Sequence, residues 1–106
     1  MQNLSWSTNE KRIARTVFER AAIAEEKEVL EHFKQRVAAL QSIQDLWNLQ
    51  DEIYNAERSY QHKYDFRYSQ LIIVFSQLLR EGRISFEDLE GLSEEKLSYI
   101  RLAASL

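Results

Sequence analysis

The chain has 106 residues, which suits one compact folding unit or a long helix carrying a small head. Hydrophobic residues make up 44% and charged residues 29%, a composition that excludes the disordered class, and two glycines with no proline favour helices over hairpins and sheets. The net charge is −3 and every basic run is interleaved with glutamate, which disfavours a nucleic-acid-binding surface.

The first predicted element is a long helix. Ser7 and Glu10 have the spacing of a capping box, and after them no glycine or proline interrupts the chain until Gly82. Later in this helix, spacings of three and four residues produce an apolar stripe of the kind that packs one helix on another, formed by Leu30, Phe33, Val37 and Leu40.

The second predicted helix begins after a break or kink near residues 41–43, where Ser42 precedes Asp45 by three residues and offers a second N-cap. It has two marked faces. One is apolar and consists of Leu46, Leu49, Ile53, Ala56 and Tyr60. The other mixes aromatic and charged side chains and consists of Ile43, Trp47, Gln50, Asp51, Tyr54, Glu57 and Arg58.

We interpret the mixed face as a surface for another chain. So small a protein can bury one face of this helix against its own helices, and mixed aromatic and charged residues are typical of interfaces. For Trp47, a place in the core is the alternative. Asp51 and Arg58 lie two helical turns apart, too far to pair within one helix, but in an antiparallel dimer each could meet its counterpart across the two-fold axis.

The rest of the chain predicts a helical head. Asp65 is expected to cap a strongly hydrophobic helix that Gly82 ends, and Ser85 and Ser93 are expected to cap two short helices that follow. The predicted fold is therefore all-α, with a long helical stalk at residues 7–62 and a compact head at 63–106. We expect one domain over residues 1–106 that dimerises through the stalk.

No set of residues with catalytic or metal-binding chemistry is found. His32 and His62 each have one carboxylate at helical spacing, which is too few ligands for a metal, so we interpret both as surface histidines. No nucleophile, phosphate-binding loop or cofactor fingerprint accompanies the carboxylates. With no signal peptide and no apolar run of membrane-spanning length, we expect a cytoplasmic, non-enzymatic protein without cofactor, metal or membrane insertion.

Two segments resemble a known family. KYDFRYSQLIIVFSQLLREG at residues 63–82 and DLWNLQD at residues 45–51 are similar to the fluorescence recovery proteins of cyanobacteria. The similarity runs from about Asp45 to Leu106, whereas the first forty residues match in helical character alone. The resemblance implies a small helical homodimer that binds the photoactivated orange carotenoid protein, mainly at its C-terminal domain, and hastens its return to the dark-adapted form. Detachment from the phycobilisome at the thylakoid surface would then end photoprotective quenching.

The resemblance also assigns residues. Trp47 and Asp51 fall where the family has the Trp and Asp of its dimer interface, and six residues match its head motif, namely Lys63, Tyr64, Asp65, Arg67, Phe75 and Gln77. The resemblance places a partner-binding surface at Ile73, Phe75 and Tyr99, with a core position as the alternative for Phe75.

Four positions depart from the family pattern. Gln50 stands where a His is common, and Glu57 stands where an interface Arg is expected, with Arg58 one residue further along. In the head, Ile73 replaces an exposed Phe and Tyr99 replaces a Lys. These changes keep open the alternative of a diverged homologue, a dimeric helical module that binds another regulatory protein.

Overall fold

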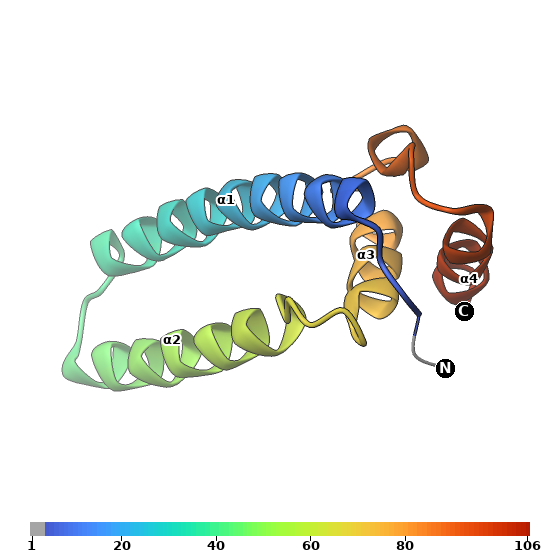
Figure 1. Ribbon diagram of the computed structural model, residues 1–106. Coiled ribbons are helices and arrows are strands. Elements are labelled where there is room, and N and C mark those ends of the chain that lie inside the picture. Colours follow the sequence, from blue (N-terminus) through green and yellow to red (C-terminus); the bar gives the residue numbers. More distant parts are fainter. Residues whose placement is uncertain (1–3) are drawn as a thin grey trace.

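The computed structural model describes residues 4–106 as an elongated arrangement of helices (Figure 1). In chain order they are α1 (Thr8–Ala38), α2 (Ile43–Lys63), α3 (Leu71–Arg80), the 3-10 helix η1 (Phe86–Leu89) and α4 (Glu94–Ala104). The molecule measures 54 × 24 × 22 Å and its radius of gyration is 16.9 Å, whereas a compact chain of this length has a radius of about 13 Å. The all-α fold expected from the sequence is confirmed.

Helix starts are set by serine caps, as the sequence predicted. Ser7 and Glu10 form a capping box at α1, in which the Ser7 hydroxyl accepts from the Glu10 amide at 3.1 Å. Ser42 caps α2 in the same way through the Asp45 amide. Ser85 and Ser93 cap η1 and α4. Each of these serines satisfies an amide that the first helical turn leaves without a partner.

The predicted cap at Asp65 is wrong. Helix α3 begins at Leu71, after a non-helical segment over residues 64–70, and the Asp65 carboxylate instead accepts from Arg67 Nε at 2.8 Å. The cause is aromatic packing, because the Phe66 ring lies 4.9 Å from that of Phe18 on α1 and 5.6 Å from that of Tyr68. The contact with Phe18 packs the segment against α1 in a non-helical conformation, so α3 begins only at Leu71.

The core lies in the head, where the first half of α1 packs on α3 and η1 and where α4 packs on α3. Ala14, Val17 and Ala21 supply the α1 side, and their small size lets the helices approach closely. The other side contains the larger apolar residues Leu71, Ile72, Val74, Phe75, Leu78, Leu89, Leu92 and Ile100. Helix α2 contributes no residue to this cluster. Its position must therefore be fixed by other contacts.

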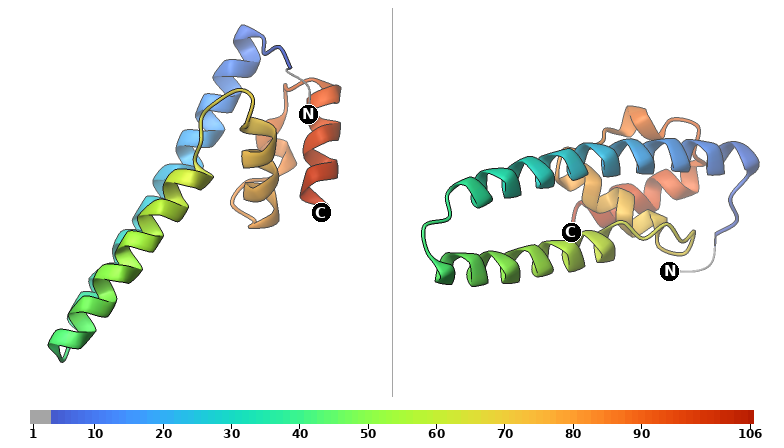
Figure 2. Two further views of the ribbon diagram at one scale, coloured as in Figure 1. Left: turned by 90° about the horizontal axis from the view of Figure 1, so that it is seen from below. Right: turned by 90° about the vertical axis from the view of Figure 1, so that its left-hand side faces the viewer.

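The second half of α1 and all of α2 form a thin antiparallel hairpin, which we call the arm (residues 22–63), and both views in Figure 2 show it extending away from the head. Within α2, Leu49 is the one buried residue. An ion pair between Arg36 and Glu52, 2.7 Å apart, also links the two helices. Leu46 and Ile53, which were expected to be buried against the chain's own helices, are 41% and 43% exposed, because the arm has no third helix to cover them.

Candidate functional site

Large apolar side chains are exposed along one side of the arm. They line two shallow grooves of about 320 and 370 Å³ between α1 and α2. We call this side the apolar face; Leu49 lies buried beneath it, and the other apolar residues that line it are Val29, Leu30, Phe33, Val37, Leu46, Trp47, Ile53, Ala56 and Tyr60. A soluble chain seldom leaves so continuous an apolar strip open to water, so this face has the character of a protein-binding surface.

The seven residues of the mixed face, which the sequence analysis assigned to contact with another chain and to the predicted dimer, are all exposed on α2. Trp47 and Gln50 line one groove of the apolar face and Glu57 lines the other. Asp51, Tyr54 and Arg58 follow Trp47 at spacings of four, seven and eleven residues and so share its side of the helix. Trp47 is 51% exposed, which excludes the alternative of a core position within one chain.

The contribution of α1 to this surface was not predicted. Leu30 and Val37, which belong to the stripe predicted to pack one helix on another, are more than half exposed, and so is Ile23. These three residues recur at seven-residue intervals, a period typical of helices that pack against partners in a bundle. That period in the sequence was the signal that could have assigned α1 to the surface.

The predicted partner surface on the head divides into exposed and buried residues. Ile73 on α3 is 53% exposed and Tyr99 on α4 is 38% exposed. The two helices pack closely, with the Ser76 hydroxyl 3.3 Å from the Ile100 carbonyl oxygen. Phe75 is completely buried, so its prediction as a partner contact is wrong for this conformation and the core alternative holds. Phe75 follows Ile73 by two residues, and in an α-helix this spacing places the two side chains on opposite sides of α3.

A buried ion pair fixes α4, and with it Tyr99, on the start of α1. Lys96 Nζ lies 3.1 Å from Glu10 Oε1, and Glu10 Oε2 accepts from the Ser93 amide at 2.9 Å. Burial alone would raise the pKa of Glu10, but hydrogen bonds from the Ser7 and Ser93 amides and from Lys96 outweigh burial and lower that pKa. Glu10 thus joins two helix N-termini through one carboxylate.

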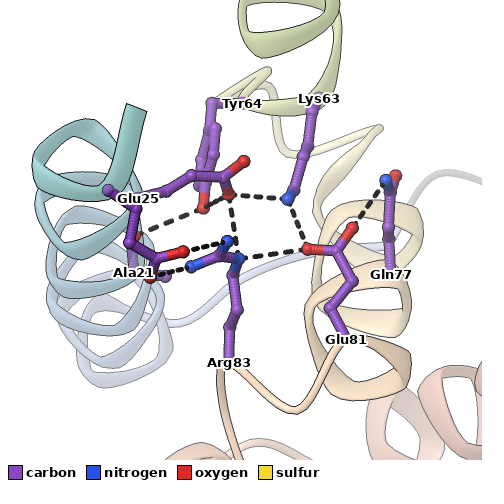
Figure 3. A network of polar contacts seen from close by, with 8 residues as sticks. Ala21, Glu25, Lys63, Tyr64, Gln77, Glu81 and Arg83 are labelled. Atoms are coloured by element: carbon purple, nitrogen blue, oxygen red, sulfur yellow. Dashed lines mark hydrogen bonds and ion pairs between the residues drawn. The ribbon is translucent and has the colours of Figure 1, made fainter. Parts of the chain in front are cut away.

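A second polar network lies where the arm meets the head (Figure 3). At its centre, the Glu25 carboxylate on α1 accepts hydrogen bonds from Lys63 Nζ at 2.6 Å and from the Tyr64 hydroxyl at 2.7 Å, and it forms an ion pair with Arg83 Nε at 3.0 Å. Lys63 also pairs with Glu81. We call this set, Glu25, Lys63, Tyr64, Glu81 and Arg83, the junction network. It joins three helices through charge-assisted hydrogen bonds.

The local backbone after α3 directs Arg83 into this network. Gly82 adopts φ +74°, a left-handed conformation that suits glycine, and the Arg83 amide then donates to the Leu78 carbonyl at 2.9 Å. The turn aims the Arg83 guanidinium back at α1, where it makes a two-pronged contact with Glu28 at 2.8 and 2.9 Å. Hydrogen bonding to Glu28 raises the pKa of Arg83, so the guanidinium stays charged.

Among residues 4–106, no group of three or more His, Cys, Asp and Glu side chains is arranged to hold a metal ion. Within the same residues, every helix is too short or too polar to cross a membrane.

Comparison with known proteins gives a consistent result. Residues 6–104 match the family model described as "Photoprotection regulator fluorescence recovery protein". A fluorescence recovery protein of Synechocystis sp. is 35% identical over 101 residues, which cover 95% of this chain and 93% of the relative. Two solved structures with that name also match. The Fremyella diplosiphon protein has a TM-score of 0.90 at 26% identity, and the Synechocystis protein has 0.89 at 34%; each match covers 96% of this chain and all of the other.

Proposed function

The chain belongs to the fluorescence recovery protein family of photoprotection regulators, and we propose that it binds the photoactivated orange carotenoid protein and accelerates its return to the dark-adapted form. Its partner would then detach from the phycobilisome at the thylakoid surface, and photoprotective quenching would end. The observation that carries this proposal is the family match over residues 6–104, which includes both the apolar face of the arm and the exposed residues of the head. No cofactor is needed for such an activity.

The arm supports a homodimer as the working form. Its apolar face leaves Leu30, Val37, Leu46, Trp47 and Ile53 between two-fifths and three-fifths exposed, and a second copy of the same face would cover them. A two-fold dimer satisfies this need with one self-complementary surface. Obligate homodimer interfaces are likewise more apolar than ordinary protein surface.

Charged residues at the edge of the apolar face would set the register of that dimer. Asp51 and Arg58 are both exposed, and no ion pair joins either one to another residue of the described chain 4–106. In an antiparallel dimer, Asp51 of one copy would meet Arg58 of the other, twice by symmetry. Glu57 lies beside Arg58 and would have to stay at the solvated rim.

The head supplies the second surface. Ile73 and Tyr99 lie exposed on α3 and α4, and we assign them to contact with the C-terminal domain of the carotenoid protein. To change a rate, the contact must stabilise the transition between the two states of the partner, since tighter binding of an end state shifts only the equilibrium. The rigid packing of α3 on α4 suits that task.

The test is the dark relaxation of photoactivated orange carotenoid protein, followed by absorbance with and without an equimolar amount of this protein. Acceleration supports the proposal. No acceleration by a folded dimer, across several carotenoid-protein variants, would favour a diverged homologue with another regulatory partner, as the departures at Gln50, Glu57, Ile73 and Tyr99 allow.

A further inference from the structure

The head motif of the sequence contains residues that neither proposed surface uses. Lys63, Tyr64 and Gln77 belong to this motif, and all three lie at the junction between arm and head (Figure 3). The Gln77 amide donates to Glu81 at 3.0 Å, and Lys63 pairs with the same carboxylate. Three residues of the head motif therefore belong to the junction network or contact it, although neither proposed surface uses them.

Helix α2 depends on the junction network for its position. It contributes nothing to the head core, and apart from Leu49 it has no buried residue. Near the turn of the hairpin it is tied to α1 by the exposed pair of Arg36 and Glu52. At its other end, Lys63 bridges Glu25 on α1 and Glu81 at the end of α3, and its side chain is only 11% exposed. Of these contacts, the ion pairs of Lys63 at the junction are better shielded from water than the pair of Arg36 and Glu52 near the turn.

The junction also touches the apolar face directly. The Tyr64 ring lies 4.8 Å from the ring of Tyr60, one helical turn earlier, and Tyr60 lines the groove that also contains Leu30 and Ile53. The Tyr64 hydroxyl is held by Glu25 at 2.7 Å. A shift of Glu25 or Tyr64 would therefore move Tyr60 and change the spacing of α1 and α2 along the groove.

From these contacts we infer that Glu25 is a positioning residue that couples the head to the apolar face of the arm, so that the state of the junction network sets the affinity of the dimer. Lys63 and Arg83 both contact Glu25 Oε1, Lys63 from α2 and Arg83 from the segment after α3. Glu25 therefore links the segment after α3 to α2, alongside the direct pair of Lys63 and Glu81. By linkage, a partner that moves the head would change dimer affinity, and dimer formation would change affinity for that partner by the same factor.

The experiment measures the dimer dissociation constant by sedimentation over a dilution series, for the wild type, Glu25→Gln and Glu31→Gln. The two substitutions remove the same charge from the same helix, but Glu31 is exposed and its side chain contacts only Gln35, within α1. We expect Glu25→Gln to weaken the dimer on the order of tenfold, a small part of the loss in folding stability that a broken buried ion pair can cause, because the change reaches the interface only through the position of α2. The control should stay within about twofold, as exposed groups contribute little.

Two further variants separate positioning from general damage to the fold. Tyr64→Phe keeps the ring and removes the hydroxyl, and should weaken the dimer about threefold, the lower end expected for one hydrogen bond. Adding Lys63→Met to Glu25→Gln removes the buried cation that has lost one of its two carboxylate partners and keeps only Glu81, and should recover part of the lost affinity. Circular dichroism at the measuring temperature verifies that each variant is fully folded.

The outcomes are distinguishable. A dimeric wild type whose dissociation constant is unchanged in folded Glu25→Gln and Tyr64→Phe would overturn this inference and leave the proposed dimer intact. This inference rests on that dimer, so a wild type that is monomeric at all concentrations would refute both. Weakening in Glu25→Gln without recovery in the double variant would point to general loss of structure and would also overturn the positioning role.

Discussion

Replacing Trp47 by Glu should separate the proposed dimer into folded monomers. A tryptophan presents up to about 250 Å² of surface, and Trp47 is 51% exposed, which leaves about 125 Å² for a partner to cover. At about 25 cal/mol per Å², full burial contributes about 3 kcal/mol per protomer and about 6 kcal/mol for both copies. Burial at an interface is incomplete, so we expect about half of this, ~3 kcal/mol, a weakening of about two orders of magnitude.

The assay is sedimentation or light scattering over a dilution series, with thermal unfolding as the check on folding. Tyr99→Glu is the matched control, because it places the same charge on an exposed aromatic position of the head, remote from the arm. It should leave the dimer unchanged. A Trp47→Glu protein that dimerises as tightly as the wild type would refute the assignment of this face, and with it the reasoning from exposed apolar surface.

Three further predictions concern the head. Phe75→Ala should lower the free energy of unfolding by about 3–5 kcal/mol in urea titration, because Phe75 is completely buried; a loss below about 1 kcal/mol would contradict its core position. Ile73→Ser should reduce the acceleration of carotenoid-protein relaxation while changing stability by less than about 1 kcal/mol, since this side chain is half exposed; unchanged acceleration would remove Ile73 from the partner surface. The pKa of Glu10 is lower in the folded chain than in the unfolded chain, where it is about 4.3. Ionised Glu10 therefore stabilises the folded state above that pH, and this stabilisation is lost as the pH falls through the lower folded-state pKa. Thermal unfolding between neutral and acidic pH should therefore show a shallower pH dependence in Glu10→Gln, and an identical profile would exclude this linkage.

The helix starts could be predicted from the sequence because a cap is a local device. Ser7, Ser42, Ser85 and Ser93 each need only an amide two or three residues away, and the spacing is visible in the sequence. Gly82 is equally local, since a positive φ is required wherever the chain leaves α3 by this turn. Where the determinant lies within one turn of the chain, the sequence was sufficient.

Predictions that depended on distant contacts failed. Asp65 has the chemistry of a cap, but Phe66 packs against Phe18, 48 positions earlier in the chain, and this contact determines where α3 starts. The mixed face of α2 was correctly expected to be exposed, whereas exposure of Leu46 and Ile53 was missed because the number of helices available to cover them cannot be read from local spacing. Comparing the number of apolar helix faces with the number of helices available to cover them would have shown that some of these faces stay exposed.

The two proposed surfaces lie at different parts of the elongated molecule, so residues of one surface can differ from the family pattern while the other surface is kept. Gln50 and Glu57 line the grooves of the arm, whereas Ile73 and Tyr99 lie on α3 and α4 at the head (Figure 1). Substitutions at distant sites without shared contacts change the free energy independently, so a substitution on the partner surface that leaves the junction network in place need not disturb the dimer. The junction network, together with the neighbouring pair of Arg83 and Glu28, joins both parts through charged contacts, and substitutions there should affect both activities together.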